Sequence, residues 1–136
     1  MKTNKILVGG VVGGIILMVV SLLVFMFLLK DYMAANYNAT LFNKEMIWWS
    51  IILSNIAVGL AFSLALSWTG RSGIIEGAKV GAILGGLFAA SMDFQFYAMS
   101  SMFNGLGIAI IDILISIVLY AIGGAAVAWA MGLIKK

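Results

Sequence analysis

The sequence predicts an all-α integral membrane protein built as a bundle of four transmembrane helices, and three observations lead to that prediction. First, 64% of the 136 residues are hydrophobic and only 10% are charged, too few polar residues to cover a soluble domain. Second, four separate apolar stretches each reach the roughly 20 residues that cross a bilayer as a helix. Third, the chain lacks the short alternating segments that are typical of a membrane β-barrel.

The predicted helices cover about residues 6–29, 46–68, 74–99 and 106–133, in a single transmembrane domain of residues 1–136. Lys2 and Lys5 precede the first stretch, as they would in a secretory signal peptide. Its apolar run is far longer than the roughly 7–15 residues of a signal sequence, so we interpret it as a membrane helix. Pro is absent from the chain, which predicts spans without proline kinks.

The distribution of basic residues predicts that both termini lie in the cytoplasm, with the bundle crossing the membrane several times. Basic flanks stay on the cytoplasmic side of a membrane. One predicted side carries Lys2, Lys5, Arg71, Lys79, Lys135 and Lys136, and the other carries Lys30 and Lys44. The net charge of +3 is explained by these flanks, so no nucleic-acid partner is expected.

Cys and His are both absent, which removes thiol nucleophiles and nearly every zinc or haem ligand set. The candidate acid–base groups lie inside predicted spans, and no nucleophile or cofactor motif accompanies them. We therefore expect no enzymatic activity, no catalytic residue, no metal site and no cofactor.

Small residues recur at helical spacing in all four predicted spans, which is typical of close helix packing in lipid. The main interpretation is that these faces hold the bundle together, and the alternative is that one face packs against another protein or a second copy. The helix-packing candidates are Gly9, Gly10, Gly13, Gly14, Gly59, Gly77, Gly81, Gly85, Ala89 and Gly124.

Two acids, Asp93 and Asp112, fall within predicted spans, where each costs roughly 2.5–3.5 kcal/mol on insertion scales. Each lies six residues from one end of its predicted helix, and these ends meet at a short loop, so both are expected about 9 Å below the outer boundary. Two carboxylates in a low-dielectric layer do not both stay ionised without a cation. Asn55, Tyr97 and Ser116 are expected to share this polar layer, either in proton or cation binding or in hydrogen bonds that fix helix register.

Residues 9–21 also align with residues 81–93 without a gap, GGVVGGIILMVVS over GAILGGLFAASMD. This similarity suggests a parallel duplication of a helical hairpin about an axis along the membrane normal. The alternative is chance, because apolar glycine-rich helices resemble one another.

A Gly-rich first span, a loop that ends in Trp48-Trp49, and GAKVGAILGG followed by two aspartates resemble small four-helix membrane proteins of bacteria that have no assigned activity. The segment NIAVGLAFSLAL looks like the Asn- and Gly-containing helix of small fluoride channels, but the Arg expected in helix 1 and the polar break expected in helix 3 are missing. Duplicated rotary-ATPase proteolipids are similar in their Gly-rich helices and helix-4 carboxylate, but differ in orientation and loops. These resemblances assign no functional residues.

Two functions remain as hypotheses. The first is a non-enzymatic accessory or assembly subunit that packs through its small-residue faces in a homo-oligomer or a larger membrane complex. The second is a small proton- or cation-linked transporter or channel-like oligomer that uses Asp93 and Asp112. Membrane lipid is the one partner expected in both cases.

Overall fold

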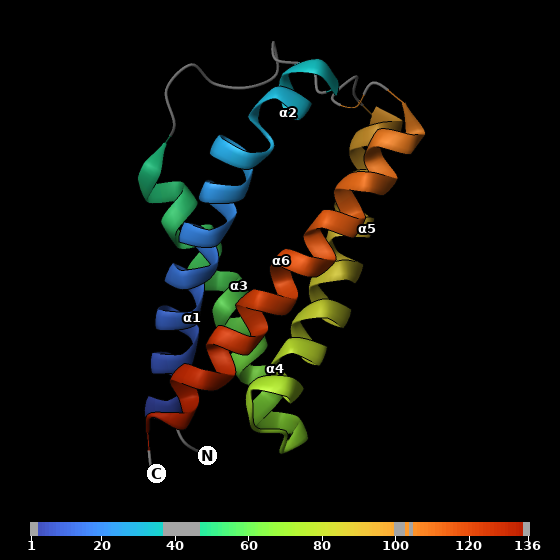
Figure 1. The fold of residues 1–136 in the computed structure, drawn as a ribbon. Helices are drawn as coiled ribbons and strands as arrows, with labels where there is room; N and C mark the ends of the chain where they lie inside the picture. Colours follow the sequence, from blue (N-terminus) through green and yellow to red (C-terminus); the bar gives the residue numbers. More distant parts are fainter. Residues whose placement is uncertain (1–2, 37–46, 100–102, 104, 135–136) are drawn as a thin grey trace.

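The computed structural model describes residues 3–36, 47–99, 103 and 105–134, and within these ranges the chain is helical with no β-strand (Figure 1). Its elements are α1 (Thr3–Leu23), the π-helical segment η1 (Val24–Leu28), α2 (Lys30–Asn36), α3 (Trp48–Thr69), α4 (Ile74–Val80), the π-helical segment η3 (Gly81–Gly85), α5 (Gly86–Met99) and α6 (Leu106–Gly132).

Four continuous helical runs in the described part are long and apolar enough to cross a membrane: Thr3–Leu28, Trp48–Thr69, Ile74–Met99 and Leu106–Gly132. The all-helical prediction with four long apolar helices is therefore confirmed. The first helix begins at Thr3 rather than at residue 6, and residue 46, where the second was predicted to begin, lies outside the described residues. The start of α1 and the end of α6 lie at one end of the bundle, which we call the terminal end; the opposite end is the distal end (Figure 1).

Helix α3 ends at the terminal end because Gly70 takes a left-handed conformation, with φ of 70°. Its amide donates hydrogen bonds to the carbonyls of Leu66 and Ser67, and the Thr69 hydroxyl donates to Ala65 O at 2.7 Å. A left-handed residue at this position is a common helix stop, and Gly adopts it without the cost of a Cβ. The tight turn that follows leads directly into α4.

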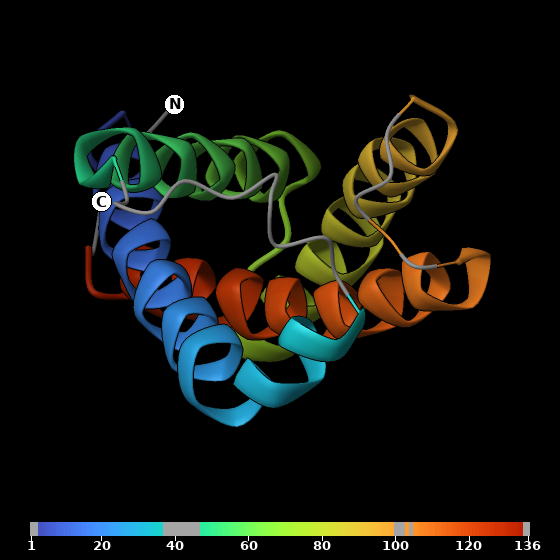
Figure 2. The ribbon, with the colours of Figure 1, turned by 90° about the horizontal axis from the view of Figure 1, so that it is seen from above.

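Helix α6 is central to the arrangement, since it packs against α1 and also against the run formed by α4, η3 and α5. Helix α3 packs mainly against α1. Toward the distal end α3 and α5 diverge, as both views of the ribbon show (Figures 1 and 2). The main packing thus runs as a row, α3–α1–α6–α5, rather than as a closed square of four helices.

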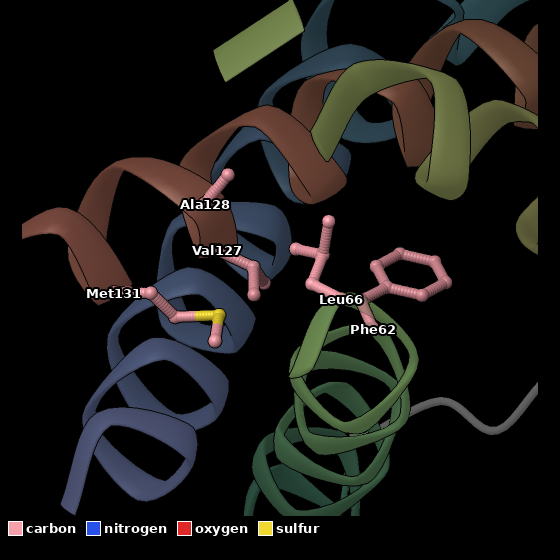
Figure 3. Packing of buried hydrophobic residues seen from close by; sticks show 5 residues of the cluster. All are labelled: Phe62, Leu66, Val127, Ala128 and Met131. Atoms are coloured by element: carbon pink, nitrogen blue, oxygen red, sulfur yellow. The ribbon is translucent and has the colours of Figure 1, made fainter. Parts of the chain in front are cut away.

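The main hydrophobic core lies in the terminal half of the bundle, where α1, α3 and α6 converge (Figure 3). Its buried members come from α3 and α6 and are Phe62, Leu66, Val127, Ala128 and Met131. A smaller distal cluster joins Phe103 and Ala109 to Tyr32 of α2. Side-chain packing therefore supports the terminal half more extensively than the distal half.

The α4–η3 run approaches α6 so closely that backbone meets backbone. A Cβ added to Gly81 would overlap the Tyr120 carbonyl, and one added to Gly124 would lie 2.8 Å from Gly81 Cα. Real Cβ atoms essentially never come this close to a neighbouring atom. Only Gly at these positions allows this helix spacing.

Helix α1 uses two glycine pairs for two different neighbours. A Cβ on Gly13 would lie 2.7 Å from Val127 Cα of α6, and Gly9 likewise faces Val127 and Met131. A Cβ on Gly14 would lie 2.6 Å from Asn55 O of α3, and Gly10 also faces α3. Adjacent glycines of one sequence motif, Gly13 and Gly14, thus contact two different helices, and Gly9 lies near Ser63 of α3 as well as α6.

The segment η3 keeps the small-residue stripe of the third span on one face. At 3.6 residues per turn, each four-residue step advances about 40° around a regular α-helix, so four steps would turn the stripe by about 160°. A π-helical turn contains more residues per turn and takes up part of this drift. Accordingly all five stripe positions are buried: Gly77, Gly81, Gly85, Ala89 and Asp93.

The packing is less symmetric than the aligned repeat would imply. Gly9 and Gly81 occupy matching positions in the alignment, yet both face the same helix, α6. A two-fold axis relating the hairpins would instead direct Gly81 toward α3. The parallel duplication therefore stays a prediction about the sequence, without a matching pseudosymmetry in the described helices.

Candidate functional site

The candidate site is centred on a carboxyl pair between α5 and α6. Asp93 is only 8% exposed, and its Oδ2 is buried without a hydrogen-bond partner among the described residues. The Asp112 side chain lies within hydrogen-bonding and electrostatic reach of Asp93. Helices α5 and α6 therefore bring together the two acids that the sequence analysis selected.

The two carboxyls meet because their helices run antiparallel and carry them at matched depth. Asp93 lies six residues before the end of α5 at Met99, and Asp112 lies six residues after α6 begins at Leu106. At 1.5 Å per residue, each is about 9 Å from the distal end of its helix. The burial of Asp93 follows from the stripe described above, which turns it toward α6.

The remaining predicted site residues lie less centrally. Asn55 donates its side-chain amide to Ile51 O of its own helix at 2.9 Å. Ser116 is half-buried one turn beyond Asp112, whereas Tyr97 is 44% exposed near the end of α5. Tyr97 was expected in the polar layer but its side chain is exposed, and the side-chain hydrogen bond of Asn55 stays within α3.

Tyr120 is a neighbour of the acids that the sequence analysis did not include among the site residues. It is close enough to both Asp93 and Asp112 to interact electrostatically with them. Its ring covers Gly85 and makes an edge contact with Phe62, with ring centroids 6.0 Å apart. Helical side chains lean toward the helix N-terminus, which directs the Tyr120 hydroxyl toward Asp112. In the sequence, Tyr120 follows Asp112 by eight residues, which places both on one face of a helix, and this spacing could have identified Tyr120.

The site can in principle hold a proton or a cation. Two adjacent carboxyls in an apolar layer are stabilised when they share a proton or bind a positive ion. No group of three or more His, Cys, Asp or Glu side chains occurs in the part of the chain that the structure describes. A cation at Asp93 and Asp112 would therefore need further oxygen ligands from hydroxyls, backbone carbonyls or water.

The predicted packing glycines face other helices of the same chain. Gly59 of α3 fits against Gly10 and Gly14 of α1, while Gly77 fits against Gly124 and Ala128 of α6. These glycine stripes are therefore occupied by helices of the same chain and leave no space for a second protein. Any partner surface has to be sought on other helix faces.

Fold and site together define a class: an all-helical chain with four helices long and apolar enough to cross a membrane, and a carboxyl pair between two of them. No protein-family model, no curated protein and no solved structure matches this chain. The functional argument therefore depends on the residues of this chain.

Proposed function

We propose that the chain is an integral membrane protein of a bacterial inner membrane with both termini in the cytoplasm. The described basic residues at the terminal end, Lys5, Arg71 and Lys79, support this orientation. The exposed indoles of Trp68 and Trp129 at this end, and of Trp48 and Trp49 at the other, are consistent with two membrane interfaces. Because the chain has no Cys, single cysteines can be introduced at Ser72 and at Asp31. A membrane-impermeant maleimide applied to intact spheroplasts should label Asp31→Cys and not Ser72→Cys; the reverse pattern would overturn the orientation.

The proposed function is that of a non-enzymatic accessory or assembly subunit that binds a transmembrane helix of a partner along α5. The observation that supports it is the position of α5 at one end of the helix row. In the described chain α5 packs mainly against α6, and its opposite face is open.

That open face carries two polar side chains. Ser91 and Gln95 each lie two residues from buried Asp93, about 200° around the helix from it, and both are exposed. Hydroxyl and amide groups facing hydrocarbon favour a hydrogen-bonding neighbour on another helix. The glycine stripes are occupied within the chain, so this polar pair replaces them as the proposed partner contact.

To test this, the protein is extracted from native membranes in mild detergent and purified through a tag placed after Lys136. Intact-complex mass spectrometry then gives the composition of the purified particle. We expect foreign subunits in fixed ratio, and their loss when Ser91 and Gln95 are both replaced by Leu. The matched control replaces Ser50 and Ser54 of α3, an exposed pair at the same spacing, by Leu. A monomer in every case, or equal loss from both variants, would contradict binding through α5.

A second candidate function, proton- or cation-linked transport, is favoured by the buried, unpartnered Oδ2 of Asp93 beside Asp112. An ionisable residue at membrane depth is by default a functional hypothesis. Proteoliposomes that contain the purified chain should then show proton or cation flux that Asp93→Asn and Asp112→Asn each abolish. Asp31→Asn is the control, since Asp31 is exposed outside the long helices. Flux that survives both substitutions, or no flux in the unmodified protein, would exclude this function.

A further inference from the structure

A cavity of about 470 Å³ opens at the terminal end, far along the helices from the carboxyl pair. It lies between the start of α1, the turn that joins α3 to α4, and the last turns of α6. Its volume is within the roughly 300–1,000 Å³ of small-ligand pockets. Neither the carboxyl site nor the proposed partner face uses it.

The cavity lining is cationic on one side and apolar on the other. Lys5 and Arg71 contribute positive charge, Ser67 and Ser72 contribute hydroxyls, and no acidic residue belongs to the described lining. Much of the remaining wall is apolar and includes Leu133. This combination fits a ligand with an anionic group and an apolar body.

The charges near the cavity are only partly neutralised. Arg71 is paired with Glu76, which also accepts Lys79 at 3.0 Å. One carboxylate therefore serves two cations, and Lys5, half-buried in the wall, forms no ion pair with any residue that the structure describes. A second anion at the cavity would neutralise part of the remaining positive charge.

The position of the cavity along the helices indicates where its ligand comes from. It sits where the apolar runs end, beside Trp129, and indoles favour the headgroup level of a bilayer. Basic pockets between helices at this level are suited to lipid phosphates, with the acyl chains along the apolar wall.

We propose that this cavity binds the phosphate headgroup of an anionic phospholipid from the leaflet on the terminal side, with Lys5 as its principal cationic contact. The proposal rests on the proposed membrane insertion of the chain, which is tested separately by alkaline carbonate extraction of the membranes. It does not depend on a partner at α5. The lipid would seal the terminal end where α1, α3 and α6 converge.

The experiment uses the full-length protein, purified and delipidated in neutral detergent, and titrated with dioleoyl phosphatidylglycerol or dioleoyl phosphatidylcholine. Bound lipid is counted by intact-complex mass spectrometry. We expect one phosphatidylglycerol to be retained in excess phosphatidylcholine. Lys5→Gln should weaken its binding about 5-fold, which corresponds to the roughly 1 kcal/mol of one lysine near an anionic lipid. Lys5→Arg should retain it, and Lys30→Gln, which removes the same charge at the distal end, should leave it unchanged.

Equal binding by Lys5→Gln and the unmodified protein would overturn the proposal. So would equal weakening by Lys30→Gln, which indicates general attraction of a basic protein to anionic lipid. Competition by inorganic phosphate at the lipid's concentration would identify a free-anion site instead. Thermal midpoints without lipid show whether each variant is folded, and Lys5→Arg decides the question if Lys5→Gln unfolds.

Discussion

The terminal and distal halves of this bundle are built differently. In the terminal half three helices converge on Phe62, Leu66 and Val127, and glycines bring backbones into contact. In the distal half α3 and α5 diverge, and a small cluster around Phe103 joins α2 to the start of α6. One half is closely packed, and the other carries a carboxyl pair, of which Asp93 is buried, beside an open helix face.

The difference indicates a division of roles within one short chain. Close packing leaves little freedom to change a side chain without a cost in stability. A loosely bounded half can hold polar groups such as Asp93 and leave a helix face for another molecule. We therefore expect substitutions in the core of the terminal half to change folding, and substitutions at the carboxyl pair or on the open face of α5 to change transport or partner binding.

The largest effect is expected for Leu66→Ala, because Leu66 is 1% exposed at the centre of the terminal core. The cavity left behind should lower the free energy of unfolding by about 2–5 kcal/mol. The control is Leu53→Ala on the same helix, where Leu53 is 58% exposed. Unfolding in a titration from mild detergent into sodium dodecyl sulfate, followed by tryptophan fluorescence, measures both. Equal losses would contradict a terminal core.

The next effect is expected for Gly81→Ala. The new methyl group would meet the Tyr120 carbonyl, so α4–η3 and α6 must separate, at a cost of about 1–3 kcal/mol. Gly107→Ala is the matched control in α6, because a Cβ there has no neighbour within 4 Å in the described structure. The same titration applies, and an unchanged Gly81→Ala protein would show that the close helix approach does not stabilise the fold.

A smaller effect of opposite sign is expected for Ser63→Ala. Ser63 is fully buried in the terminal half, and its hydroxyl has no hydrogen-bond partner among the described residues. Removing a buried unsatisfied hydroxyl should raise the free energy of unfolding by about 1 kcal/mol. Ser54→Ala, on the exposed side of the same helix, should change it little. A loss of stability in Ser63→Ala would indicate a partner for that hydroxyl.

The smallest effect on stability is expected for Asp93→Asn, although Asp93 is as buried as many core residues. The amide has the shape of the carboxyl and can donate a hydrogen bond to Asp112, so the free energy of unfolding should change by less than about 1 kcal/mol. Asp31→Asn is the exposed control. A loss above about 2 kcal/mol would give Asp93 a role in fixing helix register and remove the contrast between the two halves.

Much of the fold could be predicted from the sequence because helix length and hydropathy are local properties. The four long apolar runs lie within a few residues of their predicted bounds, and the depth match of Asp93 and Asp112 follows from counting residues to the helix ends. To predict the contact between the two acids, it was enough that their helices are antiparallel neighbours joined by a short loop.

Other features depend on packing that no local pattern encodes. The π-helical turn at η3 has no Pro in the sequence to mark it, and it lies against Tyr120 of α6. The divergence of α3 and α5 leaves Tyr97 exposed, and the side-chain amide of Asn55 bonds to its own helix. Small-residue faces on all four helices could equally have closed a square, and the arrangement as a row depends on which glycine faces fit best.

The central position of α6 has a consequence for biogenesis. Chains emerge from the ribosome in N-to-C order, so α6 is the last of the four long helices to be made. Until α6 is present, Gly13 on one side and Gly77 and Gly81 on the other lack the helix that they face. The three earlier helices therefore lack the surface against which these glycines pack, and α6, once made, joins the two sides of the bundle.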